Sequence, residues 1–154
     1  MNFRILFYTK AQSSQRKKEV ARMDENALSK EIIGAAIDVH RALGPGLLES
    51  VYEECLCREI ILRNIEFERQ VSIPVQYKGV KLECAYKLDI LVDDKVVVEI
   101  KSVEQVTPVH FKQLLTYLRL TDKKLGLLIN FNEEVVRKGV HRIVNGLLAP
   151  LTKD

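Results

Sequence analysis

The sequence lacks paired cysteine motifs and long apolar runs, the features that indicate zinc sites and membrane spans. Its three cysteines (Cys55, Cys57 and Cys84) lack the paired spacing of zinc sites, so we expect reduced thiols in a cytoplasmic protein. No apolar run approaches the roughly 18 residues that span a bilayer, and the start of the chain lacks the long apolar region of a secretory signal. With 47% hydrophobic and 29% charged residues, the composition excludes collagen, coiled-coil and disordered chains and predicts a globular domain.

Charge is distributed unevenly along the chain. Residues 1–22 carry six basic residues and one acidic residue, whereas the remainder has a net charge of −2. We predict a basic, disordered N-terminal extension over 1–22 and a single domain over 23–149. The extension is interpreted either as an arm that contacts nucleic acid or, preferably, as sequence preceding a natural start at Met23. Any nucleic-acid contact by the slightly acidic domain has to depend on a local patch.

Three stretches have the apolar spacing of helices. The first predicted helix covers residues 27–43 and ends at Gly44-Pro45-Gly46, because glycine and proline terminate helices. The second covers 47–63 and carries carboxylates beside its apolar stripe. The third covers about 108–121 and begins at Thr107-Pro108, with threonine as the N-cap and proline in the first turn.

The remaining patterns predict strands. Apolar residues alternate with polar ones from Phe67 to Tyr77, and two further strands, 80–92 and 95–101, flank Asp93-Asp94. The run 125–131 predicts a buried strand parallel to an earlier one across the third helix. Residues 140–148 are left open as a strand, a helix or one of each. The order α-α-β-β-β-α-β predicts an α/β fold whose mixed central sheet is flanked by helices.

Three charged residues on the central predicted strands suggest catalysis. Asp89 lies on one strand, and Glu99 and Lys101 share one face of the next, which is the most apolar strand of the chain. A surface ion pair is the simpler explanation, but buried charges are costly unless they have a function. Two carboxylates on neighbouring strands provide the oxygen ligands that Mg²⁺ or Mn²⁺ prefers, and Lys101 would then stabilise the reacting water and phosphate.

The ordered set Leu88-Asp89, nine intervening residues and Glu99-Ile100-Lys101 resembles the PD-(D/E)XK nuclease superfamily. The stretch Gly46-Leu47-Leu48-Glu49-Ser50-Val51-Tyr52 resembles the motif of the GxxExxY family within it. The resemblance spans about residues 23–148 and implies a restriction-endonuclease-like core. Two positions depart from the pattern: Leu88 replaces the usual proline, and Lys87 replaces an arginine, which would turn a bidentate contact into a point-charge contact.

The resemblance also implies roles for residues outside the two central strands. Glu49 corresponds to an additional acidic residue that supports the metal, with Glu53 as a fallback, and Tyr52 lies one turn further along the same face. Gln113 and Tyr117 match the Q-x-x-x-Y signature of RecB-like members and would contact substrate. Glu49 as a helix-terminal carboxylate and Gln113 with Tyr117 as an ordinary polar helix face remain the alternatives. His110, one turn earlier, is expected to be solvated or capping.

The sequence therefore predicts a magnesium-dependent nuclease. Asp89, Glu99 and Glu49 are the expected metal ligands, Lys101 completes the catalytic set, and Tyr52, Gln113 and Tyr117 would bind substrate. The expected partner is nucleic acid, with DNA favoured over RNA. The alternative is a non-catalytic nucleic-acid- or protein-binding module that retains the nuclease fold, and a homodimer through the first helix or a sheet edge is left open.

Overall fold

The computed structural model describes residues 14–15 and 23–146, without the side chains of 83–85. Apart from residues 14–15, the extension expected over 1–22 lies outside the described residues, as does the end of the domain expected near 149. Met23, where the domain was expected to begin, packs against the hydrophobic core. No helix in the described part of the chain is long and apolar enough to cross a membrane.

Within residues 23–146, two helices precede the sheet, as the apolar spacing predicts. α2 (Glu25–Leu43) begins where the Asp24 carboxylate accepts a hydrogen bond from the backbone N–H of Ala27 at 2.7 Å. It ends at Gly44, whose φ of 68° is one that glycine adopts without strain. A short loop leads to α3 (Glu49–Leu62), whose first residue is Glu49.

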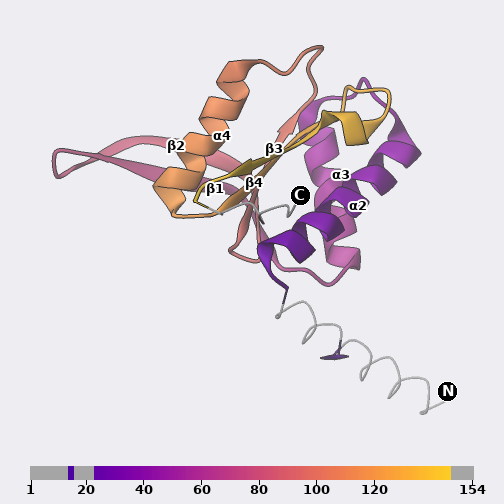
Figure 1. The fold of residues 1–154 in the computed structure, drawn as a ribbon, viewed down its shortest axis with the longest axis horizontal. Helices are drawn as coiled ribbons and strands as arrows, with labels where there is room; N and C mark the ends of the chain where they lie inside the picture. The colour runs from indigo at the N-terminus through magenta and orange to yellow at the C-terminus, as the bar shows by residue number, and fades with distance from the viewer. Residues whose placement is uncertain (1–13, 16–22, 147–154) are drawn as a thin grey trace, which may run out of the picture.

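Five strands form one mixed sheet in the order β1-β2-β3-β4-β5. β1 (Phe67–Tyr77), β2 (Val80–Val92) and β3 (Val96–Lys101) are consecutive and antiparallel, which confirms the predicted arrangement. The β1–β2 hairpin extends well beyond the rest of the sheet (Figure 1). Its register shifts between the pairs Ile73↔Tyr86 and Val75↔Leu82, and β2 has more residues than β1 between these two pairs.

The second half of the sheet is built across a helical crossover. α4 (Pro108–Thr121) leads into β4 (Leu125–Asn130), which pairs in parallel with β3, as predicted. The segment that the sequence left open forms a short 3-10 helix, η1 (Val136–Gly139), followed by β5 (Val140–Val144), which is antiparallel to β4. β3, the most apolar strand, is therefore central.

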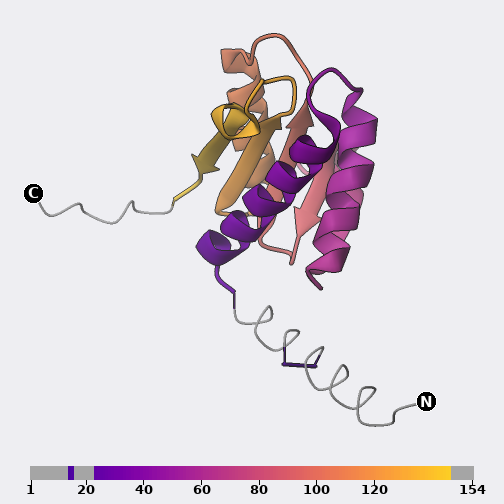
Figure 2. The same cartoon turned by 90° about the vertical axis from the view of Figure 1, so that its right-hand side faces the viewer.

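The sheet is covered on both faces, which explains its apolar central strands. α2 and α3 lie on one face and α4 lies on the other (Figures 1 and 2). One core cluster joins α2 and α3 to Ile90, Val98 and other residues of the sheet, and a second joins α4 to Leu88, Val97 and Leu128. Alternate residues of β3 thus contact opposite layers.

Candidate active site

The site lies where β2 and β3 separate. Their ladder extends from Val92↔Val96 to Ile90↔Val98 and goes no further. Asp89 is the next residue of β2, and its Oδ2 accepts a hydrogen bond from the backbone N–H of Ile100 at 2.8 Å. A side-chain oxygen thus replaces a backbone acceptor at the point of divergence, and the carboxylate is held beside β3.

Glu99 and Lys101 lie on the same face of β3, as their spacing predicts. Lys101 Nζ donates to Glu99 Oε1 at 3.0 Å, and their side chains are 15% and 5% exposed. The pair is buried in the central strand, so it differs from the exposed surface pair that was the simpler explanation. Glu99 Oε2 is buried and is the one such side-chain oxygen or nitrogen without a hydrogen-bond partner among the described residues.

Burial and mutual proximity shift the pKa values of Glu99, Asp89 and Lys101. Burial, with a further contribution from Asp89, raises the pKa of Glu99 to about 7. Burial also raises the pKa of Asp89, although the hydrogen bond from Ile100 opposes this. Burial lowers the pKa of Lys101, but Glu99, Glu49 and Asp89 outweigh it and raise the pKa overall. Lys101 therefore stays cationic, while Glu99 takes up protons close to neutral pH.

Glu49 approaches the same end of β3 from the start of α3. Its Oε1 accepts a hydrogen bond from the backbone N–H of Ser102 at 3.2 Å, one residue beyond Lys101. Ser102 Oγ donates to the carbonyl of Leu47 at 2.6 Å, so two contacts connect the end of β3 to the start of α3. Sequence reasoning did not identify Ser102, because a serine after a strand carries no distinctive signal.

Tyr52 is placed in the core and has no exposed surface. Its ring stacks on Phe131 with centroids 4.4 Å apart. Its hydroxyl accepts from the N–H of Leu47 at 3.1 Å and donates to the carbonyl of Gly44 at 2.6 Å. The tyrosine expected to bind substrate therefore holds the loop before α3, and this is the loop that Ser102 also contacts.

α4 brings Gln113 and Tyr117 toward Glu99 and Lys101. This pair lies on the α4 face of β3, because Val97, two residues before Glu99, packs in the α4 cluster. The Gln113 amide donates to the Tyr117 hydroxyl, as residues four apart on a helix can do. Tyr117 is 3% exposed, and its ring packs against that of Tyr86. Burial raises its pKa, and Glu99 contributes to the rise. His110 caps the helix: its Nδ1 accepts from the Thr107 N–H at 3.1 Å, which confirms the capping expectation.

A sequence profile of the PD-(D/E)XK nuclease superfamily matches residues 26–143. The chain belongs to this superfamily. The match covers both helices before the sheet, all the catalytic candidates and most of β5. No curated protein and no solved structure matches the chain.

The PD-(D/E)XK site has a neighbouring polar group that sequence reasoning only partly identified. Glu53, the fallback metal ligand, is 7% exposed and already has a partner for each oxygen. Arg69 Nε donates to Oε1 at 2.9 Å, and Gln70 Nε2 donates to Oε2 at 2.8 Å. Arg69 also contacts Glu54. Glu53 therefore joins α3 to β1 next to Asp89, and Arg69 and Gln70 were missed.

Asp89 and Glu99 supply oxygen donors of the type that a divalent metal takes. In the described part of the chain, no three His, Cys, Asp or Glu side chains form a group that could hold a metal by themselves. Asp89 and Glu99 provide two carboxylates, and the unpartnered Glu99 Oε2 is a buried oxygen with free lone pairs. Mg²⁺ is usually bound by one or two carboxylates, with water and substrate phosphate completing its coordination. Two carboxylates suffice for that mode.

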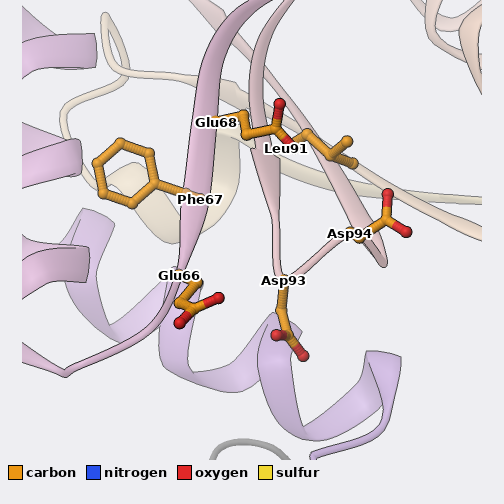
Figure 3. A pocket seen from close by; sticks show the side chains of 6 residues that line it. All are labelled: Glu66, Phe67, Glu68, Leu91, Asp93 and Asp94. Atoms are coloured by element: carbon orange, nitrogen blue, oxygen red, sulfur yellow. The ribbon is translucent and has the colours of Figure 1, made fainter.

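A hollow with acidic residues in its lining lies at the opposite end of β2 and β3. It is lined by Glu66, Phe67, Glu68, Leu91, Asp93 and Asp94. Figure 3 shows its carboxylates spread around the turn rather than facing one another. Asp93 pairs with Lys95 at 2.5 Å and Asp94 with Lys123 at 2.7 Å. These ion pairs stabilise the turn, and the site at Asp89 and Glu99 remains the catalytic candidate of the PD-(D/E)XK domain.

Proposed function

We propose that the protein is a magnesium-dependent nuclease that hydrolyses phosphodiester bonds in DNA or RNA, with DNA the favoured substrate, and that it belongs to the GxxExxY branch of its superfamily. The observation that carries the proposal is the buried, unpartnered Glu99 Oε2 beside Asp89 and Lys101. An unsatisfied buried carboxylate oxygen is costly unless a ligand completes its interactions. Manganese would be accepted by the same oxygen donors.

Asp89 and Glu99 would hold the ion, with Glu49 supporting it from the start of α3. When bound, Mg²⁺ would polarise the phosphate and offset its developing negative charge. Glu49 already accepts the Ser102 N–H through Oε1, which leaves Oε2 to face the site or its water.

Lys101 would act on the reacting atoms. Its ammonium has three donors, of which one is used by Glu99 Oε1. The others can bind the attacking water and a phosphate oxygen. Water would form the new P–O bond and lose a proton to solvent, the bond to the departing sugar oxygen would break, and that oxygen would take up a proton from solvent. The buried cation would stabilise the additional charge of the transition state.

The residues around this centre would position the substrate. Gln113 is half-buried and would contact the nucleic-acid strand, whereas Tyr117 is nearly buried and would position the Gln113 amide through its hydroxyl. Because Tyr52 is buried, we give it a positioning role through the loop that precedes Glu49.

The deciding experiment measures cleavage by the purified protein with Mg²⁺ or Mn²⁺ on single-stranded, duplex, flapped and branched DNA and on RNA. Lys101→Ala should keep metal binding but lower cleavage by about 10²-fold or more. Glu99→Gln should lose both. Lys95→Ala, which removes a lysine at the far end of β3, is the matched control and should cleave normally.

A contaminating nuclease would not respond to either site substitution, so all variants are purified in parallel. Absence of cleavage on every substrate, with Lys101→Ala binding nucleic acid as the wild type does, would replace the nuclease with a binding module.

A further inference from the structure

Gln70 has a backbone conformation that is unusual for a strand. Its φ is 49°, in the left-handed region, although it lies inside β1. A residue other than glycine held there costs on the order of 1–3 kcal/mol, and such strain persists only where surrounding contacts enforce it. The register places Gln70 directly across from Asp89, because Arg69↔Ile90 and Val71↔Leu88 are the paired positions on either side.

Both strands of the hairpin change face at this pair. Arg69 contacts Glu53 and Glu54 on α3, whereas Val71, two residues later, packs in the cluster formed by α4. On β2, Ile90 belongs to the cluster of α2 and α3, and Leu88 belongs to that of α4. Residues two apart on a regular strand share a face, so Gln70 and Asp89 mark a local irregularity shared by the two strands.

This irregularity has a consequence for the Asp89 side chain. In a regular strand, Asp89 would lie on the face opposite to that of both neighbours, Leu88 and Ile90. Here those neighbours occupy opposite faces, and the Asp89 carboxylate is directed sideways into the gap between β2 and β3. Its hydrogen bond to the Ile100 N–H shows this direction, because that N–H lies on the neighbouring strand.

The contact that enforces the conformation comes from α3. The Gln70 amide donates to Glu53 Oε2 at 2.8 Å, while Arg69 holds the other oxygen at 2.9 Å. Glu53 is nearly buried, whereas Gln70 is exposed, so the bond is anchored at its α3 end and only partly shielded from water. α3 also carries Glu49, and one helix therefore contacts the site both through Glu49 and through the strand opposite Asp89.

We propose that Gln70 is a positioning residue, whose left-handed backbone, held by Glu53, directs the Asp89 carboxylate toward Glu99. The inference rests on the proposed function, because it assigns Asp89 as a metal ligand. Gln70 itself touches neither substrate nor metal. A β-branched residue at this position favours a regular strand and would turn Asp89 away, whereas glycine accepts the left-handed conformation without strain.

The test compares Gln70→Gly with Gln70→Val in the full chain. Mn²⁺ and Mg²⁺ affinities are measured by calorimetry, and the melting temperature without metal is recorded for each variant. Gln70→Gly should bind metal within about threefold of the wild type, and Gln70→Val should bind about tenfold or more weakly. Gln76→Val is the matched control, because Gln76 is an exposed residue of the same strand with ordinary φ.

The two proposals fail in different ways. Metal binding by the wild type with equal affinity in Gln70→Val overturns the positioning role and leaves the nuclease standing. Absence of metal binding in the wild type overturns both. If Gln70→Val does not fold, Gln70→Ala replaces it, since alanine carries part of the left-handed penalty. The Gln70→Ala variant should then bind metal more weakly than the Gln70→Gly variant, and equal metal affinities of the two variants would contradict the inference.

Discussion

Asp89 uses one carboxylate oxygen to complete the hydrogen bonding of Ile100, its neighbour across the gap between β2 and β3. The carboxylate therefore has two tasks: it substitutes for the missing ladder bond, and it faces the site beside Glu99. A change at Asp89 affects both tasks unless the acceptor is preserved. Asparagine preserves it and alanine does not, which allows the structural and the metal-binding contributions to be separated.

Mg²⁺ or Mn²⁺ should raise the melting temperature of the wild type, because a ligand bound only by the folded state stabilises that state. Asp89→Asn should abolish the metal-induced shift while retaining an acceptor for the Ile100 N–H. Asp89→Ala should abolish it too, but with a buried N–H unpaired it should be less stable than Asp89→Asn by about 1–3 kcal/mol.

Thermal and urea unfolding with and without metal measure both effects. Asp94→Asn, at the far turn, is the control and should respond to metal as the wild type does. A shift of unchanged size in Asp89→Asn would show that the metal binds elsewhere.

Metal affinity should depend on pH through Glu99. Burial raises its pKa to about 7, so below that pH a proton has to leave before the carboxylate can bind a cation. The apparent affinity should rise with pH and level off above about 7, and at pH 6 it should be roughly tenfold below its limit. Titration calorimetry in buffers of different ionisation enthalpy measures the released proton.

The same group should affect folding stability without metal. Because the folded-state pKa lies above the ordinary value of 4.5, ionisation of Glu99 should destabilise the folded protein as pH rises from about 4.5 to about 7. Glu99→Gln should lack this loss. A wild type and a Glu99→Gln variant with parallel stability profiles over this range would argue against the raised pKa.

Tyr52→Phe should destabilise the protein by about 1–3 kcal/mol, since removal of the hydroxyl leaves the Leu47 N–H and the Gly44 carbonyl unpaired. The stacking on Phe131 should remain. Urea unfolding measures the change, and Tyr77→Phe, at the exposed tip of the hairpin, should be close to neutral. A stable Tyr52→Phe variant with impaired substrate binding would instead support direct contact by Tyr52.

The elements of the fold could be predicted because their signals are local. Gly44 and Thr107-Pro108 mark helix ends through backbone chemistry, and the apolar run of β3 reports burial on both faces. Residues 140–144 stayed ambiguous, because a five-residue strand after a short 3-10 helix is too brief for either period to show.

Spacing alone could predict only the part of the candidate site that lies on one strand, whereas Asp89, Glu49, Gln113 and Tyr117 were named from the order of the elements and the family resemblance. Glu99 and Lys101 share a face by spacing alone, and their contact follows. Gln70 could not be found this way. Counting from the turn at Lys78-Gly79 would place Asp89 opposite Glu68, and the shift between Ile73 and Val75 moves it to Gln70. Tyr52 falls in the apolar spacing of the second predicted helix, but spacing could not show that its ring stacks on Phe131, which is remote in sequence.

The register shift in the hairpin also affects how the protein behaves at high concentration. β1 is an edge strand of the described sheet, and a long regular edge offers a row of free N–H and C=O groups to other chains. Pro74 occupies the shift and has no N–H to offer, so it divides that row into two short stretches. The hairpin thereby keeps the length that its extended shape requires without presenting a continuous template for intermolecular β-pairing.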